Sequence, residues 1–103
     1  MAKMTSLGKV TVTTAGTPVQ LTSAISAAQL WAVKAAAGNT GKTYLGFSGM
    51  NKTTYSNVFW ELGPGEVFPP PGFITGGNTI NPSIVFVDAD TNNNYLSGFI
   101  LER

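Results

Sequence analysis

The sequence predicts an all-β fold: a single antiparallel β-sandwich, jelly-roll-like, with about eight short strands and little helix. Turn signals rich in Gly, Pro and Asn recur about every ten residues, which is the spacing typical of such sandwiches. Thirteen Thr, eight Asn, twelve Gly and six Pro separate short runs of Val, Ile, Leu, Phe and Tyr. Several runs alternate apolar with polar residues, the period of a strand with one buried face. A chain of 103 residues without repeat or linker is expected to form one domain.

Strands are expected where the apolar runs lie between turn signals. Residues 66–68 are a candidate edge strand, because Pro69, Pro70 and Pro71 follow at once and cannot donate to a ladder. Residues 1–7 are expected to form an N-terminal arm, and residues 8–103 the sandwich domain. The other runs of strand length are 10–13, 19–21, 44–47, 58–62, 84–87 and 95–101.

The segment from Ser23 to Gly38 supports two interpretations. Ser23 is a good helix cap, Gly38 is a good helix terminator, and the alanines between them favour helix. Trp31, Val33 and Ala35, however, alternate with Ala32 and Lys34, which is strand periodicity. A helical turn over 23–28 followed by a strand over 29–36 satisfies both signals.

The composition argues against catalysis. The chain has no His, no Cys and only five acidic residues, whereas most chemistry at neutral pH uses an imidazole, a thiolate or a tuned carboxylate pair. We therefore expect no enzyme, no catalytic residue, no cofactor and no small-molecule substrate. The net charge of +1 comes from scattered residues, so no nucleic-acid partner is expected. No apolar run approaches the ~20 residues that span a bilayer, and the first residues resemble no secretory signal.

One motif imitates a phosphate loop. Residues 36–43 match its relaxed pattern around Lys42 and Thr43, and Asp88 ends an apolar run as a magnesium-binding aspartate does. A phosphate loop must open a helix, whereas the residues after Thr43 predict a strand and a turn. The turn residues Asn39 to Gly41 suit a hairpin instead. A small nucleotide-binding protein therefore stands as a second alternative function.

Two acidic groupings imitate a metal site and a catalytic pair. Asp88, Asp90 and Asn92 have the first ligand spacings of a calcium loop, but its glycine and its glutamate are missing, so no metal is expected. Glu61 and Glu66 flank a tight turn without a supporting acid or base, which favours solvated strand ends over a glycosidase pair.

The aromatic residues are expected to fill the core. A carbohydrate-binding module would instead expose Trp60 or Trp31. The residues assigned to the core are Trp31, Tyr44, Phe47, Phe59, Trp60 and Phe86.

The order of strands and turns resembles a known family. The segments that carry the resemblance are residues 9–21 (KVTVTTAGTPVQL), 33–35 (VKA), 39–46 (NTGKTYLG), 62–66 (LGPGE) and 85–90 (VFVDAD). Together they are similar to the small β-sandwich structural proteins of tailed-phage virions, including capsid decoration or cement proteins. The resemblance also favours a strand over 29–36.

The resemblance implies a function as a virion structural protein. It implies a decoration protein that binds the outside of a phage head as a trimer, with the major capsid protein as partner, after synthesis in the host cytoplasm. A tail, baseplate or head-fibre component is the alternative. The candidate subunit-contact residues are Met4, Leu7, Pro69, Pro70, Pro71, Phe73 and Ile74.

Overall fold

The structure is a computed structural model that describes residues 3–22, 30–68 and 82–102. Within these ranges the chain forms eight strands and one short 3₁₀ helix. The elements are β1 (Lys3–Val12), β2 (Val19–Gln20), β3 (Leu30–Ala35), β4 (Thr43–Asn51), β5 (Ser56–Leu62), β6 (Val67–Phe68), η1 (Pro82–Ile84), β7 (Val85–Ala89) and β8 (Asn94–Glu102).

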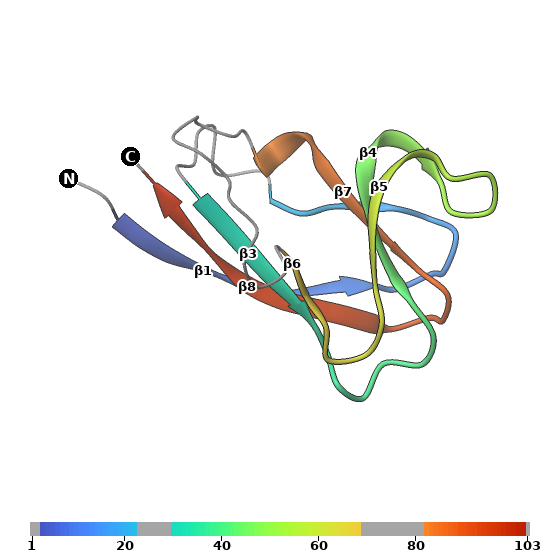
Figure 1. Cartoon of the computed structure of the whole chain (residues 1–103), viewed down its shortest axis with the longest axis horizontal. Coiled ribbons are helices and arrows are strands. Elements are labelled where there is room, and N and C mark those ends of the chain that lie inside the picture. The colour runs from blue at the N-terminus through green and yellow to red at the C-terminus, as the bar shows by residue number, and fades with distance from the viewer. Residues whose placement is uncertain (1–2, 23–29, 69–81, 103) are drawn as a thin grey trace.

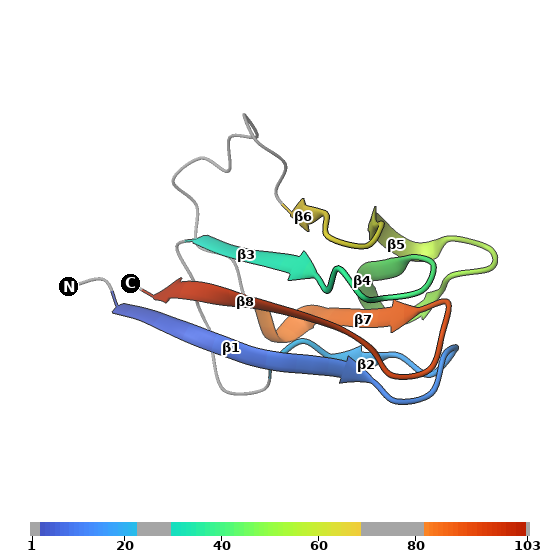
Figure 2. The same cartoon turned by 90° about the horizontal axis from the view of Figure 1, so that it is seen from below.

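The strands form two four-stranded antiparallel sheets that pack face to face (Figures 1 and 2). One sheet has the order β1-β8-β3-β6 and faces the viewer in Figure 2; we call it the front sheet. The other has the order β2-β7-β4-β5 and is the back sheet. The prediction of an all-β sandwich is therefore confirmed.

The pairing is that of a jelly roll. The first strand pairs with the last, the second with the seventh, the third with the sixth and the fourth with the fifth. The chain is thus one long hairpin rolled up on itself, and the pairs β3·β8 and β4·β7 close the two sheets.

Alternation along the strands places the core between the sheets. Trp31, Val33 and Ala35 of β3 are buried, while Ala32 and Lys34 between them point outward. Leu96 and Ile100 of β8 alternate in the same way and lie opposite the buried residues of β3. The core is completed by residues from the other strands and loops: Val12, Leu21, Leu45, Leu62, Val85, Val87 and Ala89.

The ambiguous segment contains a strand. β3 covers Leu30–Ala35 and pairs with both β8 and β6, which confirms the strand interpretation for that part. The helical turn predicted over 23–28 lies outside the described residues. The candidate edge strand at 66–68 is also present, as β6, at the end of the front sheet.

The N-terminal arm needs a correction. Lys3 to Leu7 belong to β1 and pair with β8, from the partners Lys3 and Glu102 onward. The described part of the predicted arm is therefore a strand of the sandwich. β8 continues to Glu102, so β1 gains ladder partners well before Val10, where the alternation in the sequence becomes visible.

Three of the aromatic residues assigned to the core do not lie in it. Phe86 is half-buried, between the buried residues Val85 and Val87 of β7, and it lies outside the apolar core cluster. Phe47 is 42% exposed. Tyr44 is buried, but it lies outside the apolar core cluster and donates its hydroxyl proton to Asp90. Trp31 belongs to the core, and Phe59 and Trp60 pack against it.

Candidate functional site

A polar network covers part of the back sheet. The Lys42 amine lies 2.8 Å from one oxygen of Glu61, and the Tyr55 hydroxyl donates to the other oxygen at 2.6 Å. The hydrogen bond between Lys42 and Glu61 raises the pKa of Lys42 and lowers the pKa of Glu61. Both ends of this ion pair are substantially exposed, so it adds little to stability.

Asp90 is the second centre of this network. Its carboxylate accepts hydrogen bonds from the Lys42 backbone N–H and from the Tyr44 hydroxyl, both at 2.9 Å. The Lys52 amine lies 3.8 Å from it and donates to the Ala89 carbonyl at 2.6 Å. The Lys42 N–H is the main reason that the pKa of Asp90 is lowered. Burial, together with the bond to Asp90, strongly raises the pKa of Tyr44.

The three oxygen side chains of the calcium-like spacing bond to two loops: Asp88 and Asn92 to the β1–β2 loop, and Asp90 to Lys42 before β4. Asp88 is buried and accepts hydrogen bonds from the N–H groups of Gly16 and Ala89, both at 2.8 Å. Asn92 accepts one from Ala15 at 2.8 Å. Asp88 and Asn92 therefore tie the β1–β2 loop to the β7–β8 end. Within the described ranges, no group of three His, Cys, Asp or Glu side chains is placed to hold a metal ion.

The phosphate-loop motif has a different geometry from a phosphate site. Thr43 is fully buried and begins β4, so no helix N-terminus follows the loop. The Lys42 amine is paired with Glu61 rather than directed into the loop. Asp88 is likewise bonded to the backbone of Gly16. The three residues proposed for nucleotide binding therefore have separate structural partners.

The two candidate glutamates act separately as well. Glu66 accepts a hydrogen bond from the Gly63 backbone within the β5–β6 turn. Glu61 is held by Lys42 and Tyr55. Each carboxylate therefore has its own local role.

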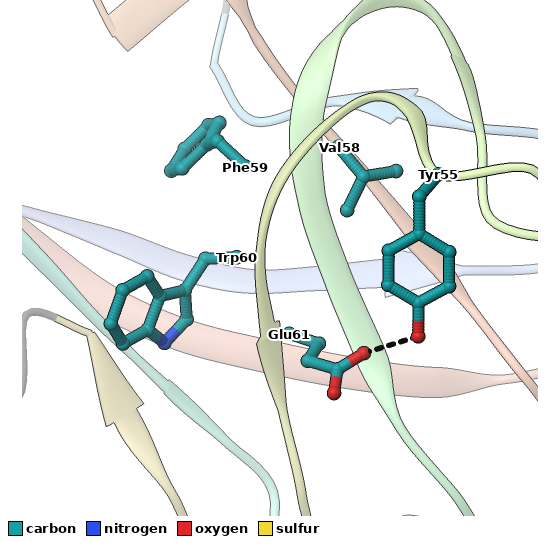
Figure 3. Close-up of a pocket in the computed structure, with 5 residues that line it drawn as sticks. All are labelled: Tyr55, Val58, Phe59, Trp60 and Glu61. Atoms are coloured by element: carbon teal, nitrogen blue, oxygen red, sulfur yellow. Dashed lines mark hydrogen bonds between the residues drawn. The ribbon is translucent and has the colours of Figure 1, made fainter.

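A shallow pocket of about 230 Å³ lies along β5, an edge strand of the back sheet (Figure 3). Phe59 and Trp60 point to one side of the strand, whereas Val58, Glu61 and Tyr55 lie on the other side. Phe59 and Trp60 both stack against Phe68 of β6, with ring centroids 5.7 and 5.0 Å apart. The rings of Phe59 and Trp60 therefore connect β5, at the edge of the back sheet, to β6, at the edge of the front sheet.

A second groove, of about 210 Å³, lies on the outer face of the front sheet. Its apolar residues are Ala32, Val67 and Phe99, and Lys34 stands at its edge. Val67 is 40% exposed. The sequence predictions did not select these residues. The signal was present, because Ala32 and Lys34 are out of phase with the buried residues of β3.

The predicted contact residues lie in different environments. Met4 lies on β1 and is 68% exposed. Leu7 is half-buried and packs against the core. Pro69, Pro70, Pro71, Phe73 and Ile74 lie outside the described residues. Trp31 is buried and so cannot form the exposed sugar platform of the carbohydrate alternative.

Comparison with known proteins adds no assignment. No protein-family profile, no curated protein and no solved structure matches the chain. Among the described residues, no helix has the length and apolar character needed to cross a membrane.

Proposed function

We propose that this chain is a virion structural protein that decorates the outside of a phage head and bridges capsid subunits. The proposal starts from the family resemblance in the strand and turn segments. A tail, baseplate or head-fibre component remains the alternative form of the same proposal.

The single observation that carries the proposal is that the polar side chains are engaged in structural hydrogen bonds, whereas apolar side chains are exposed. Asp88, Asp90 and Asn92 bond to backbone groups of the loops, while Glu61 pairs with Lys42 and Tyr55. Exposed apolar residues lie on both sheets: Met4 and Val67 on the front sheet, whose outer face carries the second groove, and Phe47 on β4 of the back sheet. Such a distribution suits a protein that makes contacts rather than one that performs chemistry. Jelly rolls serve many functions, so the fold alone does not carry the proposal.

The mechanism that we propose is mechanical. Packaged DNA pushes capsomers apart, and a protein bound across two of them resists the separation through many modest contacts. An interface of about 1,600 Å² is a standard size for a specific contact. A trimer makes several contacts at once. After the first contact forms, the others are intramolecular, and their high effective concentration raises the overall affinity.

The test is to locate the protein in purified phage particles. Mass spectrometry of the particles should detect it in many copies, and a reconstruction should place its density on the head surface. Sedimentation of the isolated protein should give a trimer. Density on the tail or baseplate would replace the capsid version by the alternative, and absence from the particles would overturn both.

A further inference from the structure

The outer face of the front sheet is built as a row of paired outward positions. Phe99 of β8 lies opposite Ala32 of β3, and Ser97 lies opposite Lys34. Lys34 in turn pairs with Val67 of β6. These positions come from three neighbouring strands, so they form one continuous surface, which faces the viewer in Figure 2. The groove described above runs through its centre.

The charged side chains that the structure describes on this face have one sign. Lys34 is exposed, and Lys9 lies on the same face with its amine 4.2 Å from the centre of the Tyr95 ring. Neither lysine forms an ion pair with a described residue. The carboxylates whose side chains the structure describes lie elsewhere: Asp88 and Glu61 are on the back-sheet strands β7 and β5, Asp90 follows β7, and Glu66 is in the β5–β6 turn.

We propose that this face is the docking surface, and that it fits a protein surface on which an apolar side chain is flanked by carboxylates. The apolar side chain fills the groove between Phe99, Ala32 and Val67, and the carboxylates pair with Lys34 and Lys9. The inference rests on the proposed function, in which this partner surface belongs to the capsid.

Two other occupants fit less well. A nucleic acid needs a dense set of phosphate contacts, whereas this face offers two lysines around an apolar groove. A second copy of this chain would have to offer its own carboxylates. Glu61 and Asp90 are already engaged by Lys42, Tyr55 and Tyr44 of the same copy.

The test uses two matched serines, each exposed in a strand. Ser97→Glu places a carboxylate in the groove, and Ser48→Glu places one on β4 of the back sheet. The probe is heads purified from phage that lack this gene, to which each purified variant is added. We expect wild type and S48E to bind equally and S97E to bind at least ten-fold more weakly. Lys34→Glu should weaken binding similarly, and salt should weaken the wild type more than Lys34→Ala. Circular dichroism and melting curves establish that each variant folds.

The outcomes separate the two proposals. If wild type binds heads but S97E and K34E bind as well as S48E, the docking face is wrong and the proposed function stands. If folded wild type does not bind heads, the docking face and the capsid version of the proposed function both fall. If sedimentation shows that wild type is an oligomer and S97E a monomer, the face joins copies of this chain, which overturns its assignment to a partner. Recovery of K34E binding by a capsid variant with a carboxylate changed to Lys would support the assignment directly.

Discussion

Asn39 and Asn94 each pair a side-chain amide with both backbone groups of a residue on the other segment: Asn39, in the loop before β4, with Tyr95 of β8, and Asn94 of β8 with Thr40 of that loop. Asn39 donates to the Tyr95 carbonyl at 2.8 Å and accepts from the Tyr95 N–H at 3.1 Å. Asn94 donates to the Thr40 carbonyl at 2.8 Å and accepts from the Thr40 N–H at 3.2 Å. The two amides thus extend the pairing between β8 and the loop before β4, where no ladder is formed.

Replacing either amide should destabilise the protein measurably. Asn94→Ala removes a buried amide that makes two hydrogen bonds to Thr40. At about 0.5–1.5 kcal/mol for each bond, the loss is about 1–3 kcal/mol. Asn39→Ala should cost a similar amount, and Asn39→Asp more, since it sets an acceptor against the Tyr95 carbonyl. Urea unfolding measures these changes. Thr53→Ala, on the exposed β4–β5 turn, should stay within about 0.5 kcal/mol; equal effects at all three positions would contradict the assignment.

Gly98→Ala should disrupt the front sheet. A Cβ at Gly98 would overlap the Ala32 carbonyl oxygen and lie 2.8 Å from the Cα of Val33. Because these are backbone atoms of β3, relief requires a shift of a strand, and we expect a loss of about 1–3 kcal/mol. Gly38→Ala is the matched control, because nothing lies within 4 Å of its Cβ position. Thermal melting of both variants compares them directly, and equal melting temperatures would show that β8 can move freely.

Acid should weaken the protein mainly through Asp90, with a smaller contribution from the exposed Glu61. The folded state lowers the pKa of both carboxyls, Asp90 chiefly through the Lys42 N–H and Glu61 chiefly through the Lys42 amine. A depressed folded pKa gives stability that is present above the unfolded pKa and is lost as the pH falls through the folded pKa. Stability should therefore hold down to about pH 5 and decline below it.

The variant that tests this acid dependence is Asp90→Asn. It should be less stable than wild type at pH 7, because an amide cannot replace both accepted hydrogen bonds. It should also lose less stability between pH 6 and pH 3, as measured by urea unfolding at each pH. An unchanged pH dependence in this variant would exclude Asp90 as a contributor.

Phe68→Ala should loosen the join between the sheet edges. The Phe68 ring lies 5.4 Å from the Trp31 ring and 5.0 Å from the Trp60 ring, measured between centroids. Its removal should cost about 2–4 kcal/mol and shift the tryptophan emission to the red as water reaches the indoles. Val67→Ala, at the exposed neighbouring position, should do neither. Unchanged emission in Phe68→Ala would contradict the proposed packing.

Magnesium-ATP should leave the melting temperature unchanged. A ligand that binds the folded state raises the melting temperature by mass action, so binding is easily detected. Lys42 is paired with Glu61 and Thr43 is buried, which gives no reason to expect a shift. A shift that Lys42→Ala abolishes would revive the nucleotide-binding alternative.

The sequence by itself determined the fold class and most of the strands. Period-two alternation is a local property, and it identified the buried residues of β3 even within an alanine-rich segment that also favours helix. Turn residues such as Asn39 and Gly41 marked the ends of strands for the same reason. The expectation of no catalysis also needs no tertiary information, because it depends only on the residue types that the chain contains.

Only the tertiary structure decided which strands pair and what each polar residue does. The sequence predicts an arm over Lys3 to Leu7, whereas these residues form a strand. Their partner, the end of β8, is more than ninety positions away in the chain, so no local pattern indicates the pairing. In the sequence Asp88 and Asp90 have the spacing of metal ligands. In the fold their carboxylates accept hydrogen bonds from Gly16, Lys42 and Tyr44, which are distant in the chain. The groove between Ala32, Val67 and Phe99 likewise joins three strands. Such contacts depend on how a long hairpin rolls up, and no local pattern encodes them.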